Sequence, residues 1–432
     1  MGNVGISASL ADQEIRRGLK AEKQRGCPVC KGEESHPLFS IAGFPYFTVP
    51  VAKSAKQEIL SKLPPSQRTA PLNVRACRTC CHCYLEDVPD SDILNFLYSR
   101  YYNYPSALKG HFHPSRDNRF ISFFDEVSAC YNKTRLQNIL EVGCYDGYIL
   151  YHLQQRGFYV TGCDPSDGAD IGRQYGVNVL KQFFSAQSFL ESDSTFDVVI
   201  SRHFIEHVTA PVSLIEEFAK ILNPDGILFL ETPNLHYYLE KGLLEVFSLQ
   251  HLQGFSPSSL EHACKKAGLR TFKIEETPDN ILVAATKGNG ERFISKETWC
   301  QAVESFNEKL NANRKKIADI VNKYVSGKQK ICLWGAGGFG LAAMLLYEIP
   351  QQAVSFIIDS DSSKWGMEYL HHHITIISPD MAREQEPDII IIASMYSLDI
   401  ERQIAAMNFR AAVLSIFPDI SLSEPVSGRL AE

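Results

Sequence analysis

Two glycine-rich turns, each directly after a short apolar strand, constrain the fold of this chain more than any other feature. The first is NILEVGCYDGY over residues 138–148, and the second is KICLWGAGGFG over residues 330–340. A glycine at the end of a parallel strand lets the backbone approach a ligand where a Cβ atom would collide. Apolar strands alternate with helical stretches after each turn, which predicts parallel sheets covered by helices on both faces. The chain is therefore predicted to contain two doubly wound α/β domains.

The 432 residues are too many for one ordinary domain, so we expect several. The expected division is a flexible arm over 1–26, a cysteine-rich module with a helical segment over 27–135, an α/β domain over 136–290, a helical connector over 291–328 and a second α/β domain over 329–432. Amphipathic spacing and capping residues predict helices over 91–97, 118–130 and 295–325.

The charge and hydropathy of the chain limit the kinds of molecule that it is expected to bind. The formal net charge of −7 is spread along the chain and forms no basic block that would attract nucleic acid. The N-terminus lacks the apolar core of a signal peptide, Ile6 stands where N-myristoylation requires Ser or Thr, and no apolar run approaches the ~20 residues that span a bilayer. We therefore expect a cytoplasmic protein that acts on a small molecule, with no nucleic acid or membrane as partner. In a reducing compartment its 12 cysteines are expected to be thiols or metal ligands.

The first glycine turn carries further signals. Glu141, Gly143 and Gly147 have the spacing E-x-G-x-x-x-G, which differs from the G-x-G-x-x-G of NAD-binding domains. Asp164 ends the next predicted strand, where a carboxylate can accept hydrogen bonds from both hydroxyls of a ribose. An FDVV strand, an EHV segment and a PDG turn follow in order. An alternative is that the two glycines only allow the chain to turn tightly.

This ordered set resembles the class I methyltransferases that use S-adenosylmethionine. The resemblance implies a cofactor site made by seven residues: Glu141, Gly143, Tyr145, Gly147, Asp164, Pro165 and His203.

Two C-x-x-C pairs lie near the N-terminus: Cys27 with Cys30, and Cys77 with Cys80. Four thiolates in two such pairs suit a tetrahedral zinc ion. Cys83 makes a further C-x-x-C spacing with Cys80, so the second pair is either Cys77/Cys80 or Cys80/Cys83, unless these are ordinary reduced thiols. A shell of four sulfurs leaves no open position for a substrate, so zinc here is expected to be structural.

The whole pattern resembles the three-domain sugar C-methyltransferases, which methylate a carbon of nucleotide-linked keto-deoxysugars. The resemblance spans residues 27–418, and its motifs are the two cysteine pairs, then YYNYPSALKGH, EVGCYDGYIL, WGAGGFG, IIDSDSSKWGMEYL and PDIIIIASMYSLDIERQ. It implies a central Rossmann-like class I methyltransferase domain, a small N-terminal zinc-binding module and a C-terminal second Rossmann-like domain. The implied cofactors are S-adenosylmethionine and structural zinc, and the implied substrate is a nucleotide-linked sugar.

One segment departs from that family. Similar enzymes carry a Y-x-E-H cluster ahead of a Phe-Ser step, and here the segment reads FSLQHLQGFS. Ser248 stands in place of the Tyr and Gln250 in place of the Glu, while His251 remains. Neither the phenol nor the carboxylate is present, so the methylated atom is open between carbon and oxygen or nitrogen.

Methylation of a sugar carbon requires an enolate, because the proton beside a ketone is the one that a base can remove. The enolate oxygen then needs a partner. We expect His207 to be the base, since neutral imidazole accepts a proton near pH 7 and the resemblance places a functional His there. His251 is the second candidate, either as donor to the enolate oxygen or as the base itself. An alternative is that His207 only packs or caps, with Glu206 as a solvated charge at a helix start.

Three residues are predicted to contact the substrate: Tyr102, Tyr104 and Gln250. The amide of Gln250 can hydrogen-bond a sugar but cannot remove a proton. The alternative for the tyrosines is packing between domains.

The second glycine turn, Gly335 to Gly340, is followed by Asp359 at the end of the next predicted strand. This turn is either a phosphate site for the nucleotide of the substrate or a vestige of one. The run His371 to His373 falls in a predicted loop without a nearby Cys, which favours a surface position over a metal site.

Two other functions compete with sugar C-methylation. One is O- or N-methylation of another sugar or small metabolite, favoured by the missing Tyr and Glu. The other is a non-catalytic, zinc-bearing scaffold, which the intact glycine turn and Asp164 argue against.

Overall fold

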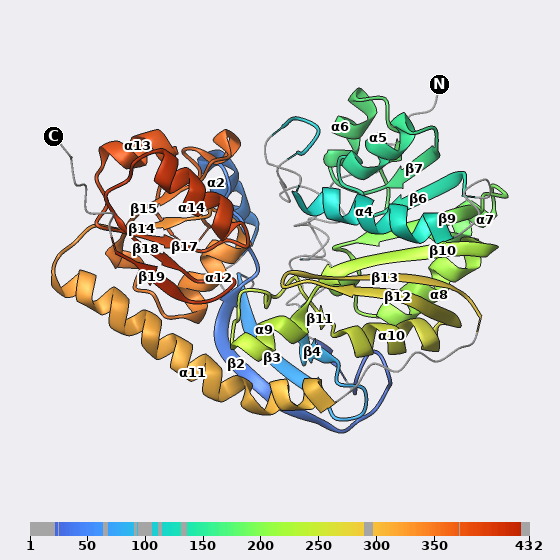
Figure 1. Ribbon diagram of the computed structural model, residues 1–432, viewed down its shortest axis with the longest axis horizontal. Coiled ribbons are helices and arrows are strands. Elements are labelled where there is room, and N and C mark those ends of the chain that lie inside the picture. The colour runs from blue at the N-terminus through green and yellow to red at the C-terminus, as the bar shows by residue number, and fades with distance from the viewer. Residues whose placement is uncertain are drawn as a thin grey trace.

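The computed structural model describes residues 22–24, 26–63, 68–89, 93, 106–110, 115–130, 136–288, 297–370 and 372–424. Two α/β domains lie side by side, and a long antiparallel sheet from the N-terminal region lies between them (Figure 1). The described residues exclude Tyr102, Tyr104, nearly all of the predicted arm, and the predicted helix over 91–97 except for Ile93.

The middle domain contains a mixed seven-stranded sheet in the order β12-β13-β10-β9-β6-β7-β8. Strands β6 to β10 are parallel, whereas β13 runs antiparallel to both of its neighbours. The strands are β6 (Asn138–Val142), β7 (Tyr159–Cys163), β8 (Val179–Leu180), β9 (Phe196–Arg202), β10 (Leu222–Pro233), β12 (Leu269–Glu276) and β13 (Asn280–Lys287). The predicted class I methyltransferase fold is confirmed.

Helices cover both faces of this sheet, as Figure 1 shows. They are α4 (Ser115–Cys130), α5 (Tyr148–Gln155), α6 (Gly168–Gln174), α7 (Ala186–Leu190), η3 (Ile205–His207), α8 (Pro211–Ile221) and α10 (Pro257–Lys266). Helix α4 buries Phe120, Phe124 and Val127 against one face, while Phe218 of α8 and Leu260 of α10 are buried on the other.

The C-terminal domain repeats the doubly wound plan. Its sheet has the order β16-β15-β14-β17-β18-β19, and only β19 is antiparallel to its neighbour. The strands are β14 (Ile331–Trp334), β15 (Val354–Ile358), β16 (Ile376–Ile377), β17 (Ile389–Ile392), β18 (Ala412–Ser415) and β19 (Ser421–Ser423). The helices are α12 (Gly338–Leu346), η4 (Gln351–Ala353), η5 (Ser362–Lys364), α13 (Pro379–Glu384) and α14 (Ser397–Ala406).

A four-stranded antiparallel sheet, in the order β11-β4-β3-β2, joins the two domains. Its strands are β2 (Ser35–Pro45), β3 (Thr69–Cys77), β4 (Cys83–Leu85) and β11 (Gln253–Gly254), and the short pair β1 (Glu22–Lys23) and β5 (Asp87–Val88) lies apart. The helices of this region are α2 (Lys53–Lys62), α9 (Leu235–Lys241) and α11 (Glu297–Ser326). Because β11 belongs to the chain of the middle domain, the N-terminal sheet is completed by a segment about 170 residues downstream of β4.

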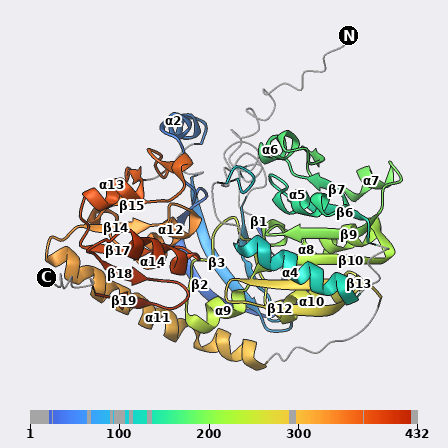
Figure 2. The ribbon, with the colours of Figure 1, turned by 45° about the horizontal axis from the view of Figure 1, so that its top comes forward.

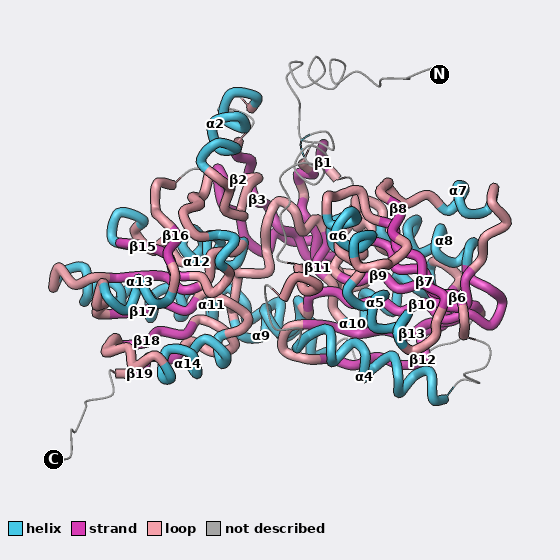
Figure 3. Tube along the Cα trace, turned by 90° about the horizontal axis from the view of Figure 1, so that it is seen from above, coloured by secondary structure: helices cyan, strands magenta, loops and turns pink. Residues whose placement is uncertain are grey.

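The core of the N-terminal region is shared with its neighbours. Phe44 and Leu72 join one apolar cluster with α9, α11 and the C-terminal domain, whereas Cys27, Val29 and Tyr84 join the core of the middle domain. The predicted connector helix is α11, which runs along the C-terminal domain toward β2 (Figures 1 and 2). Seen from above, the N-terminal strands fill the space between the two domains (Figure 3). Among the described helices, none has the length and apolar character needed to cross a bilayer.

Candidate functional site

The predicted cofactor residues lie together at the carboxyl ends of β6, β7 and β9, the edge where doubly wound sheets bind ligands. Gly143 has φ 76° and Gly147 has φ 71° at the start of α5. A Cβ atom built on Gly143 would lie 3.0 Å from the ring of Phe204. Two features therefore favour glycine at position 143: its left-handed backbone and the closeness of Phe204. Tyr145, which lies between Gly143 and Gly147, also has a left-handed backbone, with φ 49°.

Asp164 follows β7 directly and holds the glycine loop. Its Oδ2 accepts a hydrogen bond from the backbone N–H of Tyr145 at 2.9 Å, and its Oδ1 accepts one from the N–H of Ser166 at 2.9 Å. Its Oδ1 also accepts a hydrogen bond from the Ser166 hydroxyl at 2.5 Å. Two carboxylate oxygens offer about four acceptor positions, so about one is left for a ribose hydroxyl, and a second ribose hydroxyl would replace the hydrogen bond from the Ser166 hydroxyl. The carboxylate and the glycine loop beside it fit the ribose end of S-adenosylmethionine. Glu141 is buried at the end of β6, Pro165 is half-buried, and His203 follows β9 with φ 48°.

Asp146, within the glycine loop, is a residue for which no sequence motif predicted a role. Its Oδ2 accepts hydrogen bonds from the Ser106 hydroxyl at 2.6 Å and from the Leu108 N–H at 3.2 Å, and its Oδ1 accepts one from the Tyr148 N–H at 3.1 Å. Asp146 therefore ties the chain at 106–110 to the cofactor loop. Its place directly before Gly147 was the only signal in the sequence.

The two candidate catalytic histidines lie together. His207 of η3 and His251 have ring centroids 4.9 Å apart at an angle of 65°. Nδ1 of His207 donates to the carbonyl of Gln250 at 2.8 Å, and Nδ1 of His251 donates to the carbonyl of Val246 at 2.6 Å. Since a carbonyl only accepts, each neutral ring carries its proton on Nδ1 and has an accepting Nε2. Burial lowers the pKa of His251 to about 4, so this ring is neutral near pH 7.

The hydrogen bond from His251 to the Val246 carbonyl distinguishes between the two candidate roles of His251, base and hydrogen-bond donor. A neutral ring whose only N–H is held by Val246 cannot donate a hydrogen bond to an enolate oxygen, but its Nε2 can accept a proton. The arrangement therefore favours the role of base over the role of donor.

Glu206 is buried, with 2% of its surface exposed, and is not the solvated charge that the sequence suggested. The short helix η3 turns it inward, where Oε1 lies 3.6 Å from Nδ1 of His203 and 4.0 Å from Nε2 of His207. Its Oε2 accepts a hydrogen bond from the Thr232 hydroxyl at 3.2 Å. Burial acts to raise the pKa of Glu206, but the His203 contact and the neighbouring imidazoles outweigh it and hold that pKa below its usual range. The Glu206 carboxylate therefore lies among three histidines, and a second buried carboxylate, Glu231, lies 3.7 Å from Nε2 of His203.

The segment that departs from the sugar C-methyltransferases has a defined structure. Ser248 Oγ accepts hydrogen bonds from the N–H groups of Gln250 and His251, both at 3.2 Å, so it stabilises the turn that carries His251. The Gln250 side chain donates to the carbonyl of Tyr46 at 3.1 Å. The amide predicted to contact the substrate thus contacts the N-terminal region.

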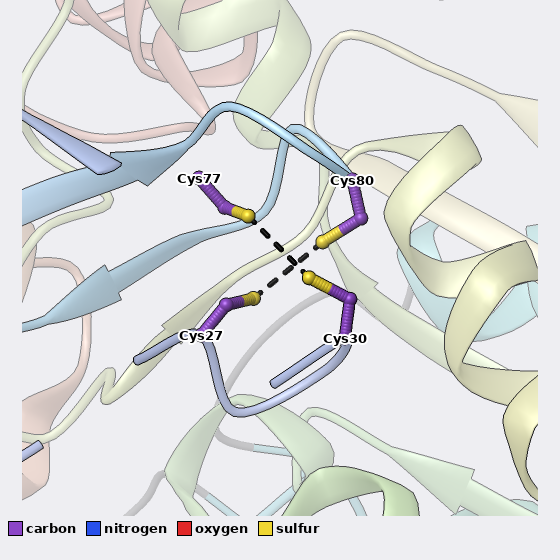
Figure 4. A group of neighbouring side chains, drawn as sticks. All are labelled: Cys27, Cys30, Cys77 and Cys80. Atoms are coloured by element: carbon purple, nitrogen blue, oxygen red, sulfur yellow. Dashed lines mark hydrogen bonds between the residues drawn. The ribbon is translucent and has the colours of Figure 1, made fainter. Parts of the chain in front are cut away.

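Four cysteines form a compact cluster (Figure 4). The Sγ atoms of Cys27 and Cys80 are 3.5 Å apart, as are those of Cys30 and Cys77, and all four lie within 4.8 Å of one another. Sulfurs on a tetrahedral zinc ion, with Zn–S near 2.3 Å, are about 3.8 Å apart. The cluster therefore has the size of a four-sulfur zinc site. The alternative ligand Cys83 is buried in the apolar cluster of the neighbouring sheet.

The cysteine cluster is connected to the histidines by a short chain of contacts. The carbonyl of His82 accepts from the N–H of Cys77 at 2.8 Å. The buried ring of His82 donates from Nε2 to Gln253 Oε1 at 2.8 Å, and Gln253 Nε2 donates to the carbonyl of Val208 at 2.9 Å. The cluster thus helps to position the segment that carries His207.

The glycine turn of the C-terminal domain is closely packed. A Cβ atom on Gly340 would lie 2.0 Å from the carbonyl oxygen of Gly335, and one on Gly338 would lie 3.0 Å from Thr48 Oγ1. Asp359 accepts from the Ala336 N–H at 2.8 Å and pairs with Lys364 at 3.0 Å. Close packing therefore accounts for glycine at these positions without a bound nucleotide.

The histidine run after β15 also has protein contacts. His373 is exposed, and its Nδ1 lies 3.3 Å from Glu368, which also pairs with the buried Lys56 of α2 at 2.9 Å. His371 lies outside the described residues.

Comparisons with known proteins agree with this architecture. A family model described as a methyltransferase domain matches residues 113–274, and one described as a C-methyltransferase C-terminal domain matches residues 291–412. The C-methyltransferase NovU of Streptomyces niveus is 23% identical over 347 residues, which cover 74% of this chain and 80% of that protein. A ubiquinone biosynthesis O-methyltransferase of Hydrogenovibrio crunogenus is 29% identical over 167 residues, which cover 34% of this chain and 67% of that protein.

Among solved structures, the magnesium protoporphyrin IX methyltransferase of Synechocystis PCC 6803 with bound SAH is 15% identical. The match covers 46% of this chain and 94% of that chain, with a TM-score of 0.34.

The fold, the glycine loop and the methyltransferase relatives define the protein as an S-adenosylmethionine-dependent methyltransferase. The C-terminal family model and the similarity to NovU over most of the chain support, more narrowly, a C-methyltransferase family.

Proposed function

We propose that this protein transfers a methyl group from S-adenosylmethionine to a carbon of a nucleotide-linked keto-deoxysugar, through an enolate. The observation that carries the proposal is the similarity to a C-methyltransferase over 74% of the chain, combined with a pair of proton-accepting histidines. One of the pair, His207, lies three residues after Phe204, which packs against Gly143 of the cofactor loop. A small-molecule substrate and a cytoplasmic location are parts of the same proposal.

The cofactor, when bound, supplies an electrophilic methyl group on a sulfonium sulfur. Gly143 and Gly147 let the backbone approach the cofactor, Asp164 accepts its ribose hydroxyls, and Glu141, Tyr145, Pro165 and His203 line the same edge.

Proton removal is assigned to the histidine pair. Nε2 of His207 takes the proton beside the ketone, and the C–H electron pair becomes the enolate double bond. The enolate carbon would then be the acceptor of the methyl group that the bound cofactor supplies. The protonated ring lies next to the Glu206 carboxylate, which stabilises the cation. His251 is the second proton acceptor. Tyr102 and Tyr104 are proposed to contact the sugar, as is Gln250, although its amide nitrogen is held by the carbonyl of Tyr46.

We also infer that Cys27, Cys30, Cys77 and Cys80 hold one structural zinc ion. Backbone N–H groups point at two of the sulfurs, from Gly32 to Cys30 and from Thr79 to Cys77, both at 3.3 Å. Such donors stabilise thiolates, the form in which cysteine binds metal.

A second candidate is O-methylation, because Ser248 and Gln250 replace the Tyr and Glu of similar sugar C-methyltransferases and one relative is an O-methyltransferase. Incubation with ¹³C-methyl-labelled cofactor and a panel of nucleotide-linked keto-sugars separates the two. We expect the NMR signal of a methyl group on carbon. A methoxy signal would replace the proposal by the second candidate.

A further inference from the structure

A second group of metal-ligating side chains lies apart from the cysteines. One ligand atom from each of Glu206, His207 and His251 lies within 4.8 Å of the other two. The residues come from two places in the chain, η3 and the loop after α9, and the contact between the His207 ring and the Gln250 carbonyl holds these places together. Among the described residues, this group and the cysteine cluster are the two that could hold a metal ion.

Both histidines are oriented as metal ligands usually are. A histidine that binds a metal through one ring nitrogen almost always donates its other N–H to a backbone carbonyl or a carboxylate, which fixes the tautomer. Here the Nδ1 atoms donate to the carbonyls of Gln250 and Val246 at 2.8 and 2.6 Å. The Nε2 atoms are thereby left in the unprotonated form that a metal requires.

The carboxylate supplies the negative charge. Oε1 of Glu206 is buried and has no hydrogen-bond donor closer than His203 Nδ1 at 3.6 Å, while Oε2 is held by Thr232. A buried carboxylate oxygen without a donor is costly, and a cation close to it removes that cost. This oxygen lies 4.0 Å from Nε2 of His207, so a small rotation of either side chain brings both onto one ion.

We propose that Glu206, His207 and His251 form a binding site for one divalent zinc ion, separate from the four cysteines. Two imidazoles and one carboxylate suit zinc and leave a fourth position open toward the substrate. The ion takes the Nε2 lone pairs that proton removal needs, so zinc at this site inhibits methyl transfer. That consequence rests on the proposed function, whereas the binding site itself does not.

The test uses the full-length protein, purified with its cysteine site loaded and then titrated with Zn²⁺ in a calorimeter. Wild-type protein should bind one further equivalent. His251→Gln and Glu206→Gln should each weaken this second equivalent by at least about tenfold while keeping the first. His236→Gln is the matched control, because His236 lies on α9 and belongs to neither metal-binding group. This substitution should leave the binding of both zinc equivalents unchanged.

Titration with Co²⁺ gives an independent spectroscopic readout. The second equivalent should add visible absorption without the thiolate-to-cobalt charge-transfer band that marks the cysteine site. His207→Gln is a third variant and should likewise weaken binding of the second equivalent. Unchanged binding of S-adenosylmethionine confirms that each variant is folded.

Two results would overturn the proposed site. One is wild-type protein that takes up no second equivalent of zinc, and the other is Glu206, His207 or His251 variants that bind the second equivalent as wild type does. A second equivalent that depends on the cluster but does not slow methyl transfer would support the site and contradict the inhibition. If no nucleotide-linked sugar is methylated under any metal condition, the proposed function fails and the stoichiometry still decides the site.

Discussion

Gly143 combines a left-handed backbone, φ 76°, with a neighbour, the ring of Phe204, only 3.0 Å from where a Cβ atom would lie. Gly143→Ala should therefore weaken binding of S-adenosylmethionine by roughly tenfold or more. The left-handed conformation costs an alanine about 1 kcal/mol, and Phe204 must also move away from the cofactor loop. Isothermal titration calorimetry measures the change.

Gly157→Ala is the control for this substitution. Gly157 has φ 92° but no atom within 4 Å of its added Cβ, in the turn between α5 and β7. It should lower the free energy of unfolding by about 1 kcal/mol and leave cofactor affinity unchanged. Equal affinities for Gly143→Ala and wild type would show that the loop does not contact the cofactor.

Glu245 should give the protein a pH-dependent stability. Burial raises the pKa of this carboxyl from 4.5 to about 7, beside the buried Tyr347. A raised pKa means that the stabilisation of the folded state is complete below pH 4.5 and is lost as the pH rises through 7. The loss reaches about 3 kcal/mol at most.

Urea unfolding at a series of pH values from acidic to mildly alkaline measures this effect. Glu245→Gln keeps the shape of the side chain and removes its charge, so it should flatten the pH dependence. Glu240→Gln is the matched control, because Glu240 is exposed on α9 and its substitution should keep the pH dependence of wild type. A Glu245→Gln variant whose stability still falls with rising pH as in wild type would contradict the assignment to Glu245.

For some residues of the candidate site, the sequence alone did not predict the environment of the side chain. The positions of His207 and His251 followed from their motifs, but the burial of Glu206 did not, because a charged residue at the start of a short helix is usually solvated. Its burial depends on Thr232 from β10, a contact between residues 26 positions apart.

One metal ion should stabilise the two cysteine turns, residues 27–30 and 77–80, together with the strands β3 and β4. Elemental analysis of the purified protein should find one zinc bound to the cysteines, in addition to any at the histidine cluster. The Cys77→Ser, Cys80→Ser double variant should lose that zinc and unfold more easily, because a closed structural site contributes to folding.

Cys130→Ser is the matched control, since Cys130 is exposed at the end of α4. It should keep the zinc. Zinc retained at the cysteine site by the double variant would point to Cys83 as a ligand, contrary to the geometry in Figure 4.

The elements themselves were largely predictable. Apolar periodicity placed α11 within two residues of its ends, and the glycine turns marked the starts of α5 and α12. The two-residue strand β11 was not predictable, because so short a segment has no periodicity and pairs with a strand far away in the sequence.

The sequence predicted three modules, but it did not predict how these modules share their hydrophobic cores. The N-terminal sheet packs on α11 and the C-terminal domain, while its cysteine turns pack on the middle domain (Figure 1). A sequence pattern shows which residues are apolar but not which distant partner covers them, so this bridging arrangement emerges only in the structure.

The proposed mechanism requires an enolate to form beside the histidine pair before the methyl group moves. It is tested most directly by hydrogen exchange of a nucleotide-linked keto-sugar in heavy water without methyl donor, followed by NMR. Wild-type protein should exchange the hydrogen beside the ketone, and His207→Gln should lose both this exchange and methyl transfer while binding S-adenosylmethionine normally. Exchange that survives in His207→Gln and vanishes in His251→Gln would reverse the two roles. Methyl transfer by wild-type protein to a substrate with no exchangeable hydrogen beside a carbonyl would contradict the enolate mechanism.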